Sequence, residues 1–144
     1  RDGMDISLCK IIHQKKNDAD KYHITYSGAK QSLFYIEQNT GEVQSIKGQR
    51  RSIGGKNLAL VRFSFKNYEI ELQKNDILYM TSDGIIDQNA PDRKRFGTKR
   101  LINILNKNAA LSLNEQGDNL EHALDNYQNN ERQRDDITVL GIRL

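Results

Sequence analysis

Short stretches of alternating apolar and polar residues dominate the first half of the chain. Residues 22–27 alternate ring, polar and apolar side chains, which suits a half-buried strand. Turn-forming Asn, Asp and Gly separate such stretches. The predicted strands are residues 6–12, 22–27, 33–37, 43–46, 58–65, 66–72 and 77–80, with a charged hairpin loop at 14–20. Short strands at this spacing indicate antiparallel meanders.

Beyond residue 95 the apolar positions recur with the period of a helix. Residues 96–111 place four apolar side chains on one helix face: Leu101, Ile102, Leu105 and Ala109. Thr98 is the predicted N-cap, because its hydroxyl can accept a hydrogen bond from a free backbone N–H group. We expect the apolar face to be buried against a sheet.

A second helix is predicted for residues 112–128. Ser112 and Glu115 have the spacing of a capping box, although Gly117 weakens the helix. The apolar face consists of Leu113, Leu120, Leu124 and Tyr127. Residues 137–144 then form an apolar strand. The order of strands, two helices and one strand indicates an α+β fold whose last strand returns to an existing sheet.

Composition limits the chain to one polar globular unit. Its 144 residues make one domain or a large part of one, with 36% hydrophobic residues, 28% charged residues and a mean hydropathy of −0.78. No apolar stretch approaches the roughly 20 residues needed to cross a bilayer, and no signal peptide opens the chain. We therefore expect a cytoplasmic protein. The chain begins close to a strand, so we expect it to be cut from a larger protein.

Charge and cysteine content narrow the possible functions. The formal net charge is +3, and basic residues gather only at 47–51 and 93–95, without the interleaved aromatic residues typical of a nucleic-acid binder. We expect no nucleic-acid partner. Cys9 is the single cysteine, so no disulfide can form within the chain. Neither a basic partner nor a helix start accompanies Cys9, which favours a small strand residue over a nucleophile.

Three carboxylates mark the ends of two predicted strands. Asp83 lies between Ser82 and Gly84 after the strand at 77–80, and Asp135 and Asp136 precede the last strand. Crowded carboxylates are tolerated when a divalent cation neutralises them, and oxygen ligands suit Mg²⁺ or Mn²⁺. Gly84 would let backbone and hydrated ions approach closely. The alternative is structural, because Asp-Gly is a common turn dipeptide.

Six sequence blocks occur in the order seen in metal-dependent serine/threonine phosphatases of the type 2C class, and the chain most resembles their bacterial SpoIIE-type branch. The blocks are RDGMDISLCKI, YSGAKQSLFYI, GQRRSIGG, LQKNDILYMTSDGIIDQ, KRFGTKRLINIL and QRDDITVLGIRL. The resemblance covers residues 2–144. Its most specific part is the pair SDGI and DDITVL, which two helices separate.

The resemblance implies two stacked antiparallel sheets with helices outside and a binuclear Mn²⁺ or Mg²⁺ site between the sheets. Asp83 matches the metal-binding acid of the family's SDG motif, and Asp135 matches the first acid of its RD[DN] motif. Asp136 takes the second place of that motif, which is Asn in many relatives. Gly84 matches the motif's small neighbour. No protein nucleophile is implied, because a metal-activated water attacks the phosphorus.

The chain departs from the family pattern in two places. An earlier segment with a Gly-Asp acid, a Gly-His-Gly stretch and helices does not occur in the sequence, so we expect residues 1–144 to be the C-terminal part of a single SpoIIE-type domain. Asp2 and Asp5 belong to a later element, and neither is assigned to metal. The loop with Arg50 and Arg51 lacks an acid that many relatives outside this branch carry. Its arginines could hold a phosphate, although a solvated loop is the simpler interpretation.

The implied function is metal-dependent hydrolysis of phosphoserine or phosphothreonine on a protein substrate. The resemblance also implies a phosphorylated regulator of a sigma-factor pathway as substrate, and an upstream sensor that could attach the parent protein to a membrane. We expect the chain alone to be weak or inactive. Exposed strand edges and an apolar sheet face would lead either to a self-associated or strand-exchanged dimer, or to a fragment whose missing half another chain supplies. One alternative is a non-catalytic phosphatase-like regulatory module, against which the retained Asp83 and Asp135 argue. The other is a binder of nucleic acid or acidic partners, with steep salt dependence.

Overall fold

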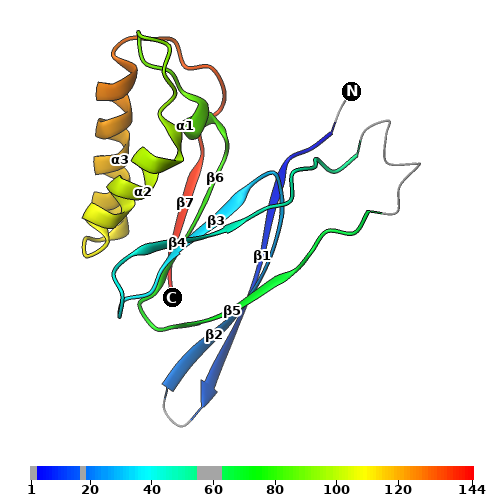
Figure 1. Cartoon of the computed structure of the whole chain (residues 1–144). Helices are drawn as coiled ribbons and strands as arrows, with labels where there is room; N and C mark the ends of the chain where they lie inside the picture. The colour runs from blue at the N-terminus through cyan, green and yellow to red at the C-terminus, as the bar shows by residue number, and fades with distance from the viewer. Residues whose placement is uncertain (1–2, 17–18, 55–62) are drawn as a thin grey trace.

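The computed structural model describes residues 3–16, 19–54 and 63–144 of the chain. Within these residues the strands come first, the helices follow, and one strand ends the order (Figure 1). The elements are β1 (Ile6–Lys16), β2 (Ala19–Ala29), β3 (Ser32–Ile36), β4 (Val43–Lys47), β5 (Tyr68–Gln73), β6 (Ile77–Thr81), α1 (Gly84–Asp87), α2 (Gly97–Asn108), α3 (Leu113–Gln128) and β7 (Val139–Arg143). None of the described helices has the length and apolar character that a membrane crossing requires.

The strands form two antiparallel sheets, with the orders β1-β2-β5 and β4-β3-β6-β7. In the larger sheet Ile77 of β6 pairs with Arg143 of β7, and Thr81 pairs with Val139. The last strand therefore returns to an existing sheet, as the sequence predicted. This register also brings the residues that follow β6 beside those that precede β7, at one end of the sheet.

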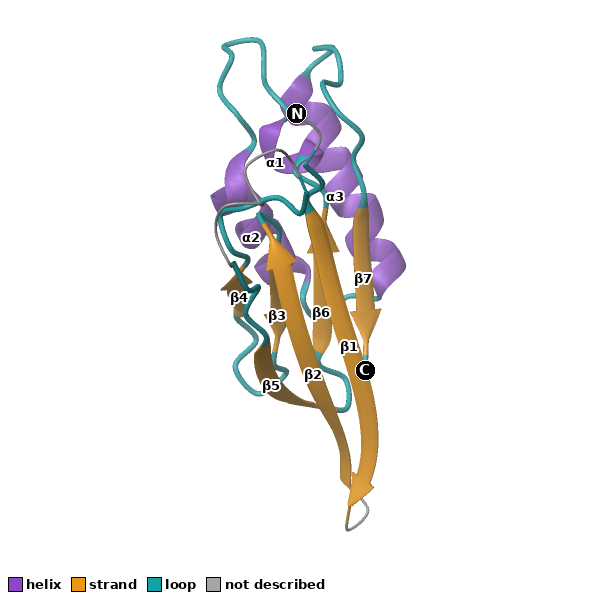
Figure 2. Cartoon of the chain, turned by 90° about the vertical axis from the view of Figure 1, so that its right-hand side faces the viewer, coloured by secondary structure: helices purple, strands orange, loops and turns teal. Residues whose placement is uncertain are grey.

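Successive side chains of the larger sheet point to opposite faces, and each face packs into a separate hydrophobic core. On β6, Ile77 and Tyr79 pack against the helices, whereas Leu78 and Met80 pack between the two sheets. Figure 2 shows the helices on one side of the strands. The described residues form three layers: helices, four-stranded sheet and three-stranded sheet. The predicted antiparallel sandwich flanked by helices is confirmed.

Helices α2 and α3 bury the apolar faces that the sequence predicted. Four of the predicted positions are buried: Leu101, Leu105, Leu120 and Leu124. Ile102 is only partly buried against the same core. The predicted capping box is present at the start of α3, because Ser112 accepts a hydrogen bond from the Glu115 N–H and the Glu115 carboxylate accepts one from the Ser112 N–H. Sequence periodicity therefore predicted the buried face of both helices, and capping chemistry predicted the start of α3.

The first hairpin is longer than predicted, because most of the predicted loop at 14–20 is paired strand. Its strands stay in register up to the pair Lys16 and Ala19. The ring of His13 stacks on Tyr22 with centroids 4.7 Å apart, and its Nε2 lies 2.7 Å from the Asp20 carboxylate. Such cross-strand contacts extend pairing into residues whose composition suggests a loop.

The start of α2 also differs from the prediction. The helix begins at Gly97, and Phe96 rather than Thr98 occupies the N-cap position. The Phe96 side chain is fully buried, and its backbone N–H donates to the Gln88 carbonyl at 2.7 Å. The Thr98 prediction was wrong because tertiary contacts, which local capping preference cannot show, set the helix start.

One predicted strand lies largely outside the described residues. Residues 58–62 of the predicted strand at 58–65 belong to that part of the chain, as does Asp2. Residues 63–65 are irregular rather than extended into a sheet. Phe63 and Phe65 instead pack edge to face, with ring centroids 5.1 Å apart. The predicted strand is therefore wrong at its C-terminal end.

Candidate metal centre

Asp83 stands where β6 ends and α1 begins. Its backbone is helical, with φ −74° and ψ −17°, and its carbonyl accepts a hydrogen bond from the Asp87 N–H at 2.9 Å. An aspartate at this position usually caps the helix with its carboxylate. The Asp83 side chain does not: it is exposed, and no hydrogen bond or ion pair joins it to any described residue. Its oxygens are therefore free to bind a ligand.

The other two predicted ligands lie in an irregular loop between α3 and β7, residues 129–138, which we call the acid loop. Asp135 and Asp136 are both exposed. One oxygen of the Asp135 carboxylate accepts a hydrogen bond from the Asp136 N–H at 2.8 Å. The Asp136 carboxylate has no partner among the described residues. Both side chains therefore present oxygens to solvent.

Residues 82–84, which we call the Asp83 segment, contact the backbone of the acid loop. The Ser82 hydroxyl donates to the Asp136 carbonyl at 2.8 Å and accepts from the Thr138 N–H at 2.9 Å, and the Ser82 N–H donates to the Thr138 carbonyl at 2.9 Å. Gly84 lies so close that a β-carbon there would stand 2.4 Å from the Asp136 carbonyl oxygen. The segments with Asp83 and Asp136 are thus neighbours, although they are far apart in sequence.

This contact also explains the glycine beside Asp83. The sequence suggested that Gly84 allows both backbone and hydrated ions to approach. The structure accounts for the backbone approach, because the acid loop occupies the space that a side chain would need. The assignment of Gly84 to the cofactor site stays a prediction.

The three carboxylates have the oxygen chemistry that divalent cations prefer. They are exposed, they supply only oxygen, and two of them lack protein partners, which suits Mg²⁺ or Mn²⁺ with several retained waters. Within the described residues, no group of three or more Asp, Glu, His or Cys side chains could hold a metal ion. The roles of Asp83, Asp135 and Asp136 as metal ligands stay predictions.

Other candidates from the sequence have structural partners. The Asp5 carboxylate accepts hydrogen bonds from the Ser52 hydroxyl and from Lys30, the latter at 3.2 Å, which agrees with leaving Asp5 out of the metal site. Cys9 packs in the core between the sheets, and burial raises the pKa of its thiol. A raised pKa leaves less thiolate at neutral pH, so Cys9 is suited to packing rather than to nucleophilic attack.

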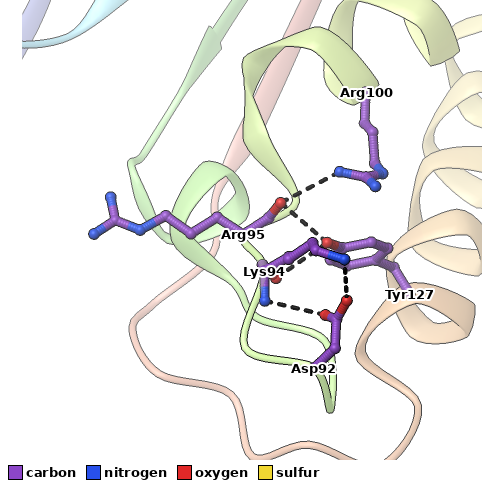
Figure 3. Close-up of polar contacts among 5 residues, drawn as sticks. All are labelled: Asp92, Lys94, Arg95, Arg100 and Tyr127. Atoms are coloured by element: carbon purple, nitrogen blue, oxygen red, sulfur yellow. Dashed lines mark hydrogen bonds and ion pairs between the residues drawn. The ribbon is translucent and has the colours of Figure 1, made fainter.

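The connection between α1 and α2 is held firmly beside the acid loop (Figure 3). The Tyr127 hydroxyl donates to the carbonyl groups of Lys94 and Arg95, each at 3.0 Å. The Arg100 guanidinium lies 4.5 Å from the centre of the Tyr127 ring and donates to the Arg95 and Phe96 carbonyls. Side chains from α2 and α3 therefore fix the backbone of this connection.

Ion pairs in the same connection neutralise part of the positive charge of residues 93–95. Lys94 forms an ion pair with Asp92 at 2.8 Å, and Arg95 pairs with Asp87 at 2.9 Å. The hydrogen bond from Lys94 holds the pKa of Asp92 below its usual value. In the other basic loop, the Arg51 guanidinium lies 4.6 Å from the centre of the Phe63 ring. The phosphate-binding role suggested for Arg50 or Arg51 stays a prediction.

Two residues near the site escaped the sequence analysis. Ser82 bonds the acid loop as described above, and Gln88 is a completely buried amide that bonds the same loop. Ser82 stands beside Asp83 in the motif, so its position was a usable signal. Gln88 carries no local signal, because its partners are 44 and 46 positions away in the sequence.

Comparisons with known proteins agree with this architecture. The family described as Stage II sporulation protein E (SpoIIE) matches residues 15–144. The SiaA-PP2C domain of Pseudomonas aeruginosa is 31% identical over 88% of this chain and 51% of that chain, with a TM-score of 0.73. A search among curated proteins gives no match.

Two structures of SpoIIE from Bacillus subtilis share the fold at lower identity. Its phosphatase domain, presoaked with Mn, is 15% identical over 94% of this chain and 56% of that chain, with a TM-score of 0.58. A longer piece with part of the regulatory domain is 18% identical over 88% of this chain and 37% of that chain, with a TM-score of 0.64. The chain spans about half the length of the phosphatase domains it matches. Because the family match covers most of its residues, the chain belongs to the SpoIIE family and has the fold of PP2C-type phosphatase domains.

Proposed function

We propose that the protein hydrolyses phosphoserine or phosphothreonine on a protein substrate and requires Mn²⁺ or Mg²⁺. The observation that carries the proposal is the contact of Ser82 and Gly84, the neighbours of Asp83, with the Asp136 carbonyl of the acid loop. Family membership supports a phosphatase activity in general. The Mn presoak of a Bacillus subtilis relative supports Mn²⁺ as the first cation to test.

In this proposal Asp83, Asp135 and Asp136 hold the cations at the end of the larger sheet. Divalent cations bound there would lower the pKa of a water and offset the negative charge of the phosphate, which lets the water attack phosphorus in line. The exposure of all three carboxylates leaves the site open to a phosphorylated side chain on another protein. No side chain of the chain is assigned as a nucleophile.

We propose that the isolated 144-residue chain hydrolyses phosphate more weakly than the parent protein does. Asp83 and the acid loop supply three carboxylates, but no three or more Asp, Glu, His or Cys side chains among the described residues form a group that could hold a metal ion. A binuclear site needs more ligands than these, so further ligands from elsewhere would complete it.

We propose that the substrate is a phosphorylated regulator of a sigma-factor pathway. We also propose that a sensor domain precedes this one in the parent protein, and that the protein acts in the cytoplasm.

The test is the variant Asp83→Asn in the parent protein. A neutral amide binds Mn²⁺ less well than a carboxylate does, so we expect a loss at least as large as the roughly 10- to 100-fold cost of losing an outer partner of a metal ligand. The measurement is hydrolysis of p-nitrophenyl phosphate and of a phosphoserine peptide, with Mn²⁺ and with a chelator. Asp118→Asn is the control, because Asp118 is an exposed acid on α3.

Two results would contradict the proposal. One is hydrolysis that the chelator does not affect. The other is an Asp83→Asn variant that hydrolyses phosphate as fast as the Asp118→Asn control. Binding of a phosphoprotein without any hydrolysis would favour the alternative, a non-catalytic regulatory module.

A further inference from the structure

The acid loop has almost no regular backbone pairing of its own. Residues 131–138 are irregular, yet several of their backbone groups are bonded by side chains from the Ser82 to Gln88 segment. Backbone groups that lack regular partners need other partners when they are held in one conformation. The side chains that bond this loop therefore decide where Asp135 and Asp136 stand.

Gln88 bonds the loop on the N-terminal side of the two acids. Its side-chain Nε2 donates to the Arg132 carbonyl at 3.3 Å and to the Asn89 carbonyl at 3.4 Å. Its Oε1 accepts a hydrogen bond from the Arg134 N–H at 3.2 Å. The amide thus uses both its donor and its acceptor, and Gln88 is 0% exposed. A buried amide with satisfied partners holds its surroundings rigidly.

Ser82 bonds the loop on the other side of the acids, through the Asp136 carbonyl and the Thr138 N–H. Asp135 and Asp136 therefore lie between two attachment points. Both attachment points belong to the segment that carries Asp83. This arrangement sets the position of the acid loop relative to Asp83 from both sides.

We propose that Gln88 is a positioning residue that holds the acid loop, with Asp135 and Asp136, beside the segment that carries Asp83. The proposal rests on the proposed metal-dependent function of these three acids. Gln88 contacts neither substrate nor cation in this role, and acts only through the backbone of Arg132 and Arg134. An apolar residue could fill the same space, but it could not bond a donor and an acceptor of the loop.

The first test uses amide hydrogen exchange in the wild-type protein, measured residue by residue with nuclear magnetic resonance. We expect the Arg134 backbone amide, which donates to Gln88, to exchange at least about tenfold more slowly than the Gln133 and Asp135 backbone amides, which donate to no described residue, because an amide in a persistent hydrogen bond exchanges only when that bond opens. Equal exchange at these three amides would show that the Gln88 bond does not persist, and would overturn the proposal without any variant.

The second test compares Gln88→Met with Gln116→Met. Gln116 is a matched control, because it is also a buried amide, accepts from the Tyr79 hydroxyl at 2.6 Å and donates to the Leu111 carbonyl at 3.0 Å. Both variants lose buried hydrogen bonds, so both lower the melting temperature. Only Gln88→Met should accelerate exchange at Arg134 and weaken Mn²⁺ binding, by roughly 10- to 100-fold as for other indirect partners of metal ligands.

These readouts separate the positioning role from the proposed function. If Gln88→Met leaves Arg134 exchange and Mn²⁺ affinity equal to those of Gln116→Met, the positioning role is wrong, whatever the wild type hydrolyses. If the wild-type parent protein neither binds Mn²⁺ nor hydrolyses a phosphopeptide, the proposed function is wrong before any variant is compared. A protein that binds Mn²⁺ and loses affinity only on Gln88→Met supports both.

Discussion

Asp83 illustrates how a single residue can be well placed for helix capping and yet not cap. It occupies the N-cap position of α1, but its carboxylate bonds no backbone N–H. The sequence motif pointed to this residue and its glycine, because both are consecutive in the chain, and their roles in a metal site stay predictions. Gln88 could not be found in this way, because a buried amide and an exposed one look alike in sequence, and its partners come from the distant acid loop.

At the residue scale we predict that Gly84→Ala displaces the acid loop. The added β-carbon would lie 2.4 Å from the Asp136 carbonyl oxygen, which is a backbone atom and cannot rotate away. Overpacking of this kind costs roughly 1–3 kcal/mol of stability. The measurement is chemical denaturation together with Mn²⁺ titration, and we expect both stability and affinity to fall.

Gly117→Ala provides the control for this prediction. A β-carbon at Gly117 of α3 would meet nothing within 4 Å, so alanine should stabilise the helix by roughly 0.5–1 kcal/mol. A Gly84→Ala protein as stable as wild type, with unchanged Mn²⁺ affinity, would show that the acid loop can move aside freely.

At the element scale, the helices show where local rules succeed. The capping box at Ser112 and Glu115 was predictable, because all of its atoms lie within four consecutive residues. The start of α2 was not predictable, because it depends on the burial of Phe96 and its bond to the Gln88 carbonyl. The buried helix faces were predictable from the periodicity of the apolar residues, because apolar residues at helical spacing form the face that packs against the core.

We predict that Leu105→Ala destabilises the fold by about 2–5 kcal/mol, the usual cost of truncating a packed leucine. Leu105 is 2% exposed and lies in the core between the helices and the larger sheet. Ile102→Ala should cost less, because Ile102 is only partly buried. Urea denaturation would measure both, and a larger loss for Ile102→Ala would mean that the buried face is misassigned.

The capping box predicts a pH dependence of stability. Hydrogen bonds from Ser112 hold the pKa of Glu115 below its ordinary value of 4.5. Because the folded pKa is the lower one, the stabilisation is complete above pH 4.5 and is lost as the pH falls through the folded pKa. Melting temperatures between pH 2.5 and 6 should fall less steeply for Glu115→Gln than for wild type. Identical slopes would assign the acid sensitivity to other carboxylates.

At the scale of the whole molecule, the described helices cover only one face of the sandwich. The register of β1 and β2 places Leu8 and Ile12 on the outer face of the three-stranded sheet, with Lys21 and His23 beside them. The stacked sheets and helices followed from the family resemblance, since strand order cannot be derived from alternation alone. The outer face carries both apolar and charged side chains. Predicting this would have required the pairing register of the strands, which the sequence pattern does not determine.

We predict that the 144-residue chain self-associates. Leu8 is 67% exposed on the edge strand β1, and Leu140 is 48% exposed on the edge strand β7, and exposed apolar edge strands favour pairing between chains. Sedimentation velocity over a concentration series should show association, which a lysine at position 8 or 140 should reduce. A strictly monomeric wild type at high concentration would contradict this.

The long separation of the two acid-bearing segments has a consequence for how the protein is made. Gln88 and Arg134 are 46 positions apart, and β6 finds its partner β7 only at the end of the chain. Distant contacts are closed after local ones, because closing a long loop costs entropy. During synthesis Asp83 therefore leaves the ribosome before α2, α3 and the acid loop do. On a nascent chain, Ser82 and Gln88 cannot bond the acid loop until residues 132–138 have left the ribosome.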